Sequence, residues 1–432
     1  MSLLFRLPLK QRTAIEPHRR LSREAATTIT IHSLFQFGAS MAGLFLNLYL
    51  WRLTEDLVIN GIYNMIVYVM TPIAFAAGGW IAKRKDRMVT YRLGILLMAL
   101  FYLLVVLMQE NVAKYYLPFS VLNGFSAGMY WMGYLVLMYD VSTDGNRIRF
   151  LALNMVFFNA AGLAGPALAG FIIGNSEGLR GYTITFALSF IMFCIAAFVS
   201  LRIPAIRTRH KAYYLNLMVI LMRKNRVWLR SLCSFFVLGL LQGIMLFLPT
   251  ILLYRTVGRE DMVGYLGVFF SGVLIASGYV ISRVAQEGRA RRYILASSTG
   301  IAAGAAFLLF DVRLWTVAVF MILFSIFNPL AINTLNSDYY KMIGVLPLKG
   351  QLRNEAVVVR ECFLNAGRVL SIALLLVFAA DLEPGRLAYV LLGASVLQYG
   401  IFWLLGGRDG EAERIRRKQN ISSGGVRGER NG

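Results

Sequence analysis

Long apolar stretches separated by short polar segments run along almost the whole chain. Each stretch covers about 20 residues or more, the length that an α-helix needs to cross a hydrocarbon layer of about 30 Å. The pattern predicts an all-α integral membrane protein with twelve transmembrane helices in two six-helix, pseudo-symmetric bundles. The predicted spans are 26–51, 57–82, 89–108, 113–139, 148–174, 181–203, 228–254, 262–284, 293–310, 312–336, 361–380 and 385–406.

A long basic segment after the sixth span divides the chain into two halves. Its middle is apolar between basic ends, as in a helix that lies on a membrane face. The fifth and eleventh spans begin with related sequences, "RFLALN" and "RECFLN", which indicates an internal duplication. We therefore expect a cytoplasmic N-terminal segment (1–25), a first bundle (26–203), a cytoplasmic linker with an amphipathic helix (204–227), a second bundle (228–406) and a disordered cytoplasmic tail (407–432).

Basic residues are distributed unevenly among the polar segments. The net charge is +22, and most of the 44 Lys and Arg fall in segments that are cytoplasmic if the N-terminus is inside. This asymmetry follows the positive-inside rule, so it predicts both termini in the cytoplasm and a plasma-membrane location. The same asymmetry explains the high positive charge, so the charge does not indicate a nucleic-acid-binding protein. The three cysteines and three histidines are dispersed, so we expect no disulfide framework, metal site or cofactor.

Two motifs resemble those of a known transporter family. The loop after the second span contains "GGWIAKRKDR", in which Gly79, Arg84 and Arg87 match the major facilitator superfamily and Lys83 replaces its acidic residue. The fifth span contains "AGLAGPALAGF", which is similar to the Gly-Pro motif of the family's exporters. The resemblance covers residues 26–406, although the fourth span lacks the arginine that antiporters of the family often carry.

The resemblance implies conformational roles for residues at the ends and bends of spans. Proline and glycine together predict a kinked, closely packed fifth span that acts at a gate, although both residues are also tolerated in ordinary membrane helices. Charges at the inner helix ends are expected to form ion pairs that break when the transporter switches. The expected gate residues are Gly79, Arg84, Arg87, Asp140, Arg149, Gly165, Pro166, Gly170, Asp338, Arg360 and Glu361.

Polar and aromatic side chains inside spans are candidates for a substrate cavity. In the family the first, fourth, seventh and tenth spans line the path, whereas any single polar residue can instead bond a neighbouring helix. The candidates are Gln36, Asn47, Asn123, Tyr130, Trp131, Tyr134, Gln242, Asn333, Asn365 and Arg368.

Arg368 is unusual because it lies inside an otherwise apolar span. Arginine at the centre of a membrane helix costs roughly 2.5–3.5 kcal/mol on insertion scales. Glu361, Asn365 and Arg368 share one helical face. Three interpretations remain open: Arg368 pairs with Glu361 or Asp338, it binds an anionic group of the substrate, or it extends toward lipid head groups.

The resemblance implies a secondary active transporter, not an enzyme, that works by alternating access. We expect export of a small amphipathic molecule. The alternative with the same fold is uptake or facilitated passage of a nutrient or an anion. The alternatives of another class are a non-transporting receptor and a membrane-embedded enzyme. Coupling to a proton or cation is expected through the rim acids Asp140 and Asp338, or transport is not proton-driven. Membrane lipids are the other expected partners, and the chain is expected to be a monomer.

Overall fold

The computed structural model describes residues 21–142, 147–204, 212–284, 289–345, 352–379, 381 and 383–406. Most of the predicted N-terminal segment, residues 205–211 of the linker and the predicted tail lie outside these ranges. The first half contains α1 (Arg23–Thr54), α2 (Leu57–Arg84), α3 (Arg87–Met108), α4 (Asn111–Lys114), α5 (Tyr116–Asp140), α6 (Arg147–Gly174) and α7 (Arg180–Ser200). The second half contains α8 (Leu215–Lys224), α9 (Arg226–Met245), α10 (Leu248–Val257), α11 (Glu260–Val284), α12 (Ala290–Phe307), α13 (Leu314–Val345), α14 (Arg353–Ala379) and α15 (Pro384–Leu397).

Each of the twelve predicted spans coincides with helical structure. Within the described residues, ten helical segments are long and apolar enough to cross a membrane, with α9 and α10 together forming one of them. The other two spans are α5 and α12, which occupy the predicted fourth and ninth positions. The prediction of an all-α membrane protein with twelve spans is therefore confirmed.

Two helices extend further than the apolar pattern indicated. The tenth span was expected to end at residue 336, but α13 continues to Val345, and the eleventh was expected to begin at 361, but α14 begins at Arg353. The added turn of α14 carries Glu355, which is fully buried. A hydropathy pattern misses such turns because contacts with other parts of the protein, and not burial in lipid, stabilise their polar side chains.

Polar side chains at the span boundaries cap the first helices. The Ser22 side chain accepts a hydrogen bond from the Ala25 N–H, and the Asp56 and Asp86 side chains accept from the second residue of α2 and α3, respectively. These caps satisfy backbone N–H groups that have no partner within a helix. They also explain why connections of only two residues suffice between α1 and α2 and between α2 and α3.

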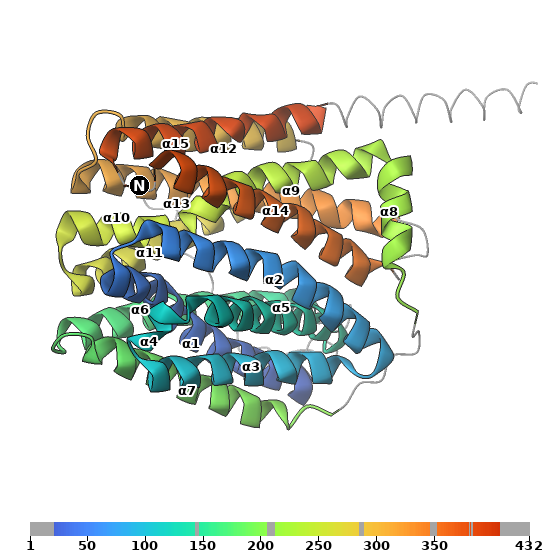
Figure 1. Cartoon of the computed structure of the whole chain (residues 1–432). Helices are drawn as coiled ribbons and strands as arrows, with labels where there is room; N and C mark the ends of the chain where they lie inside the picture. Colours follow the sequence, from blue (N-terminus) through green and yellow to red (C-terminus); the bar gives the residue numbers. More distant parts are fainter. Residues whose placement is uncertain are drawn as a thin grey trace, which may run out of the picture.

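The same helix pairings occur in both halves of the chain (Figure 1). In the first half α1 packs on α6 and α7, α3 packs on α5 and α7, and α2 packs on α5. The equivalent contacts six spans later are α9 with α14 and α15, α12 with α13 and α15, and α11 with α13. The chain therefore forms two pseudo-symmetric six-helix bundles. They meet along two pairs that are themselves equivalent, α2 with α14 and α6 with α11.

The helix bundle has two ends, which we name by their contents. The linker face holds α8, the end of α2 and the start of α14, and α8 stands across this end in Figure 1. The opposite face holds the end of α1, the end of α6 and the start of α11. Large apolar side chains such as Val377 and Trp403 are about three-quarters exposed, as expected for surfaces that face lipid.

Candidate functional site

Arg368 lies near the middle of α14, and neutral side chains surround its guanidinium group. It is ~22 Å along the axis from the first residue of the helix, at 1.5 Å per residue. Its Nη2 donates to Oε1 of Gln242 on α9 at 2.8 Å, and its Nη1 donates to Oδ1 of Asn365 at 3.1 Å. The guanidinium carbon lies 5.2 Å from the ring centre of Tyr68 on α2, in the other bundle. The side chain thus turns toward protein groups of both bundles and not toward lipid head groups.

Close packing of α9 against α14 fixes the position of Arg368. A Cβ atom at Gly239 would lie 2.2 Å from the Leu364 carbonyl oxygen, and one at Gly367 would lie 2.1 Å from the Phe236 carbonyl oxygen. Only glycine permits the two backbones to approach this closely. The interlocked glycines therefore hold the Arg368 backbone against the helix that carries Gln242.

Glu361 is not the direct partner of Arg368. Its Oε1 accepts from Nη2 of Arg360 at 2.6 Å, and both residues are almost fully buried. Asn365, which is 1% exposed, donates to the Glu361 backbone carbonyl at 2.8 Å and to Oε2 at 3.4 Å. The predicted polar face of α14 is therefore a hydrogen-bonded chain in which the Glu361 charge is matched by Arg360. Arg368 stands at its other end, and no carboxylate among the described side chains contacts it.

Tyr130 and Tyr134 belong to an aromatic cluster inside the first bundle. Tyr130 is fully buried; it stacks on Phe35 and its hydroxyl is hydrogen-bonded to Nδ1 of His32. The His32 ring lies 3.7 Å from the Tyr134 ring, centre to centre, and the Tyr134 hydroxyl accepts from Asn154 at 2.6 Å. His32 is thus a packed helix residue. Tyr130 holds α1, α3 and α5 together and has no exposed surface with which to line a path.

The remaining cavity candidates are distributed over several helix contacts. Asn47 accepts from Asn64 at 2.7 Å, and Asn123 donates to the Tyr63 hydroxyl at 2.8 Å, so both join helices of the first bundle. Trp131 is half-buried and lies edge-on to Tyr130, Tyr134 and His32. Gln36 is half-buried beside Gly162 of α6, and Asn333 of α13 is exposed. Of the ten candidates, Arg368 contacts both Gln242 and Asn365, and Tyr130, Trp131 and Tyr134 form a separate group of ring contacts.

A buried salt bridge joins the two bundles at the linker face. Lys83 at the end of α2 bonds Glu355 at the start of α14, and their side chains are 9% and 0% exposed. The backbone N–H of Tyr214, in the linker, donates to the same Glu355 oxygen at 3.1 Å. The Lys83 ammonium also lies 5.6 Å from the ring centre of Tyr213, and burial raises the pKa of the Tyr213 hydroxyl well above its usual value. The sequence had marked Lys83 only as a departure from the loop motif.

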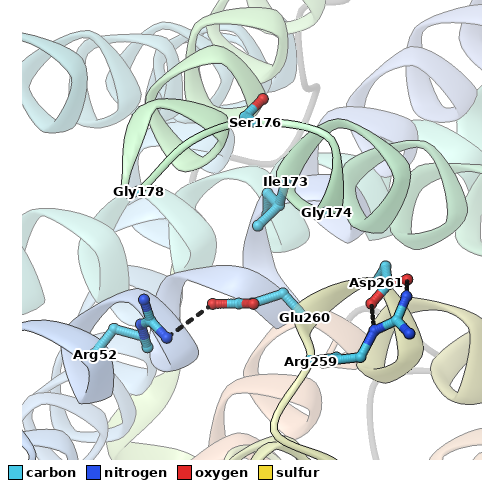
Figure 2. Close-up of a pocket in the computed structure, with 8 residues that line it drawn as sticks. All are labelled: Arg52, Ile173, Gly174, Ser176, Gly178, Arg259, Glu260 and Asp261. Atoms are coloured by element: carbon cyan, nitrogen blue, oxygen red, sulfur yellow. Dashed lines mark hydrogen bonds and ion pairs between the residues drawn. The ribbon is translucent and has the colours of Figure 1, made fainter.

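A second salt bridge joins the bundles at the opposite face. Arg52 at the end of α1 lies 3.1 Å from Glu260 at the start of α11, and it also bonds the Tyr254 hydroxyl. Figure 2 shows this pair beside a second pair, Arg259 with Asp261. The nitrogen–oxygen distance in the second pair is 2.6 Å, and residues of both pairs line a hollow of about 200 Å³. Sequence reasoning missed this contact because each residue resembles an ordinary charge at a helix end.

The Gly-Pro motif places α6 between α1 and α11. A Cβ atom at Gly165 would lie 2.3 Å from the Ser40 hydroxyl of α1, and one at Gly170 would lie 3.0 Å from the Gly264 Cα of α11. A Cβ atom at Gly264 would lie 3.1 Å from the Pro166 carbonyl oxygen. The motif therefore sits in one of the two helix pairs that join the bundles.

The other expected gate residues have varied environments. Arg84 is exposed and its guanidinium lies 4.7 Å from the ring centre of Trp80, so it is not part of a buried cluster. A Cβ atom at Gly79 would meet the Tyr213 hydroxyl at 3.0 Å, which places this glycine against the linker. Arg87 is half-buried and begins α3, and Asp338 lies within α13. The side chains of Asp140 and Arg149 lie outside the described residues.

In the described part of the chain, twelve long helical segments in two bundles, ten of them apolar enough to cross a membrane by length and composition, with a polar site between the bundles, define a polytopic membrane protein. Residues 28–346 match the model of the Major Facilitator Superfamily, so the chain belongs to this family. It is 31% identical over 378 residues to YqgE of Bacillus subtilis (strain 168), an uncharacterized protein, covering 86% of this chain and 87% of that protein. A Geobacillus stearothermophilus protein encoded in the sodM 3' region is 32% identical over 186 residues, 43% of this chain and 84% of that protein.

Solved transporter structures share the fold. The nucleoside transporter NupG superposes with a TM-score of 0.70 at 13% identity, over 89% of this chain and 99% of that one. The D-xylose-proton symporter gives 0.68 at 14% identity, over 88% and 97%. A structure from work on proton-dependent oligopeptide transporters gives 0.66 at 13% identity, over 91% and 99%. At these identities the likeness shows the fold alone, and the membership in the Major Facilitator Superfamily is what supports a secondary transporter.

Proposed function

We propose that this protein moves a small amphipathic molecule across the plasma membrane by alternating access, with export as the direction and both termini in the cytoplasm. The observation that carries the proposal is the placement of the Arg368 site between two inter-bundle salt bridges, one at each face. Access from the linker face requires the Lys83–Glu355 contact to open, and access from the opposite face requires the Arg52–Glu260 contact to open.

Each salt bridge favours one closed face, and a substrate that binds one access state more tightly than the other shifts the equilibrium between them. The α2–α14 and α6–α11 pairs provide the surfaces on which the bundles would rock. The two pairs are equivalent to each other, because each joins the second span of one half to the fifth span of the other. The motion is therefore symmetric, as expected of a transporter built from repeats.

The direction of transport is supported by the Gly-Pro motif. Its glycines contact α1 on one side and α11 on the other, which suits a tight helix contact that seals the path during export. Uptake is the second candidate, because the D-xylose-proton symporter shares the fold. The coupling ion and the monomeric state stay predictions.

Flux measurements in oriented vesicles test the proposal. Inverted and right-side-out vesicles containing the protein are incubated with a panel of labelled amphipathic compounds in the outer medium, and Pro166→Ala serves as a variant with an altered helix contact. We expect protein-dependent accumulation in inverted vesicles and slower or leaky flux in the variant. Accumulation only in right-side-out vesicles would favour the uptake alternative. The absence of flux in both orientations, with folded protein, would favour a receptor.

A further inference from the structure

Arg368 is the one charged group of its cluster whose contacts, within the described part of the chain, are all with neutral groups. Its hydrogen bonds go to the amide oxygens of Gln242 and Asn365, and its ring contact is with Tyr68. Its Nε is buried without a hydrogen-bond partner. A guanidinium has five N–H donors, so hydrogen-bonding capacity remains after these contacts are made.

The neighbouring charges do not compensate for Arg368. Glu361 is matched by Arg360 at 2.6 Å, so this pair is neutral overall and the cluster keeps one positive charge. Arg368 is half-buried, and a cation without a counter-charge is unfavourable where the surroundings have a low dielectric constant, so an anion that binds it there removes part of that cost. Gln242 and Asn365 hold the guanidinium in place without cancelling its charge.

We propose that Arg368 binds the carboxylate of a small monoanionic substrate, between α2, α9 and α14. A planar guanidinium matches a carboxylate through two parallel hydrogen bonds, and one uncompensated positive charge matches one negative charge better than the two of a phosphate ester. The Tyr68 ring of the opposite bundle lies 5.2 Å from the guanidinium carbon, so a carboxylate bound to Arg368 lies beside this ring. Because Tyr68 and Arg368 belong to different bundles, a bound carboxylate contacts both halves of the transporter. This inference rests on the proposed transport function and specifies its substrate class.

A carboxylate introduced by mutation next to Arg368 tests whether its positive charge is uncompensated, and this test does not require the substrate to be known. Gln242→Glu places an acid where an amide oxygen lies 2.8 Å from Nη2 of Arg368. We expect the melting temperature of the purified full-length protein in detergent to rise in this variant. The same change in an Arg368→Gln background is the matched control and is expected to lower it. A fall of equal size in both backgrounds would overturn the claim that Arg368 lacks an anionic partner.

Matched acid and amide probes test the ligand class. Benzoate, phenylacetate and 3-phenylpropionate are compared with their primary amides by thermal shift and by direct binding to wild-type protein, Arg368→Gln and Arg368→Lys. We expect at least one acid to bind in preference to its amide, at least a tenfold loss of its affinity in Arg368→Gln, and a smaller loss in Arg368→Lys, which keeps the charge but not the paired donors. The absence of any acid-over-amide preference, or its persistence in Arg368→Gln, would overturn the proposal.

Flux of the same probes separates this inference from the transport function. An acid that binds through Arg368 but shows no flux in either vesicle orientation leaves the binding site intact and contradicts the transport proposal. Flux of neutral compounds only, without acid binding, supports transport and contradicts the carboxylate site.

Discussion

Loss of the Glu355 charge should open the linker face. In Glu355→Gln the buried Lys83 ammonium loses its carboxylate while it remains beside the rings of Tyr213 and Tyr214. The side chains of the pair are 9% and 0% exposed, so solvent screens their charges poorly. Removing one member of a buried ion pair costs about 3 kcal/mol or more, because it leaves a buried charge without a partner. A cost of this size shifts the equilibrium toward an open linker face by roughly 100-fold.

A cysteine at Val358 reports on this opening. Val358 is 1% exposed and belongs to a cluster that joins α14 to α2 and α5, together with Phe75 and Met132. In a background without the three native cysteines, the rate at which a maleimide labels Val358→Cys in detergent follows the population of the open state. We expect Glu355→Gln to raise this rate by up to roughly 100-fold.

Two further variants decide whether the reasoning is right. Lys83→Met combined with Glu355→Gln removes both charges, so labelling should return toward the wild-type rate. Glu383→Gln breaks a half-exposed pair with Arg386 on the other side of the protein, and such surface pairs contribute about 0–1 kcal/mol, so it should leave the rate unchanged. An unchanged rate in folded Glu355→Gln would refute the role of the salt bridge in closing this face.

Four other variants, one of them a control, test the remaining contacts. Arg52→Gln removes the salt bridge at the opposite face, so that face opens more easily and the state closed at the linker face gains in population. Labelling of Val358→Cys should therefore become slower. Faster labelling would contradict this. Gly239→Ala forces a methyl group to within 2.2 Å of the Leu364 carbonyl and should lower the melting temperature markedly, whereas Gly393→Ala, which meets nothing within 4 Å, should be neutral or slightly stabilising. Pro166→Ala restores a backbone donor in α6 and should change transport rate more than stability, as flux and thermal melts measured on one preparation would reveal.

The local features of the site were predictable from residue spacing. Glu361, Asn365 and Arg368 recur at helical intervals, so their common face follows from the geometry of an α-helix alone, and the structure confirms that this face is turned toward protein. The sequence did not predict which arginine forms the salt bridge with Glu361, and the structure shows that it is Arg360 and not Arg368. Both arginines lie within reach on one helix, and the choice depends on Gln242 and Tyr68, which come from other helices.

Contacts between distant segments were missed for a related reason. Lys83 and Glu355 are 272 positions apart, and neither differs in sequence context from an ordinary charge at a wet helix end. Tyr130 was grouped with the cavity candidates because polar aromatic residues suit a cavity and a packed core equally well. Its full burial depends on the rotation of α5, which places the ring against Phe35 and Tyr91.

The sequence by itself determined the number of spans, their order and the division into two related halves, because each apolar run must be long enough to cross the hydrocarbon layer and internal similarity survives duplication. Tertiary structure alone decided which charges are paired across the bundles and that Arg368, within the described residues, contacts neutral groups only. In a membrane most of the helix surface is apolar whether it faces lipid or protein, so hydrophobicity does not fix the rotation of a helix. Close contacts at glycines and a few polar pairs fix it, and these exist only once the helices are packed.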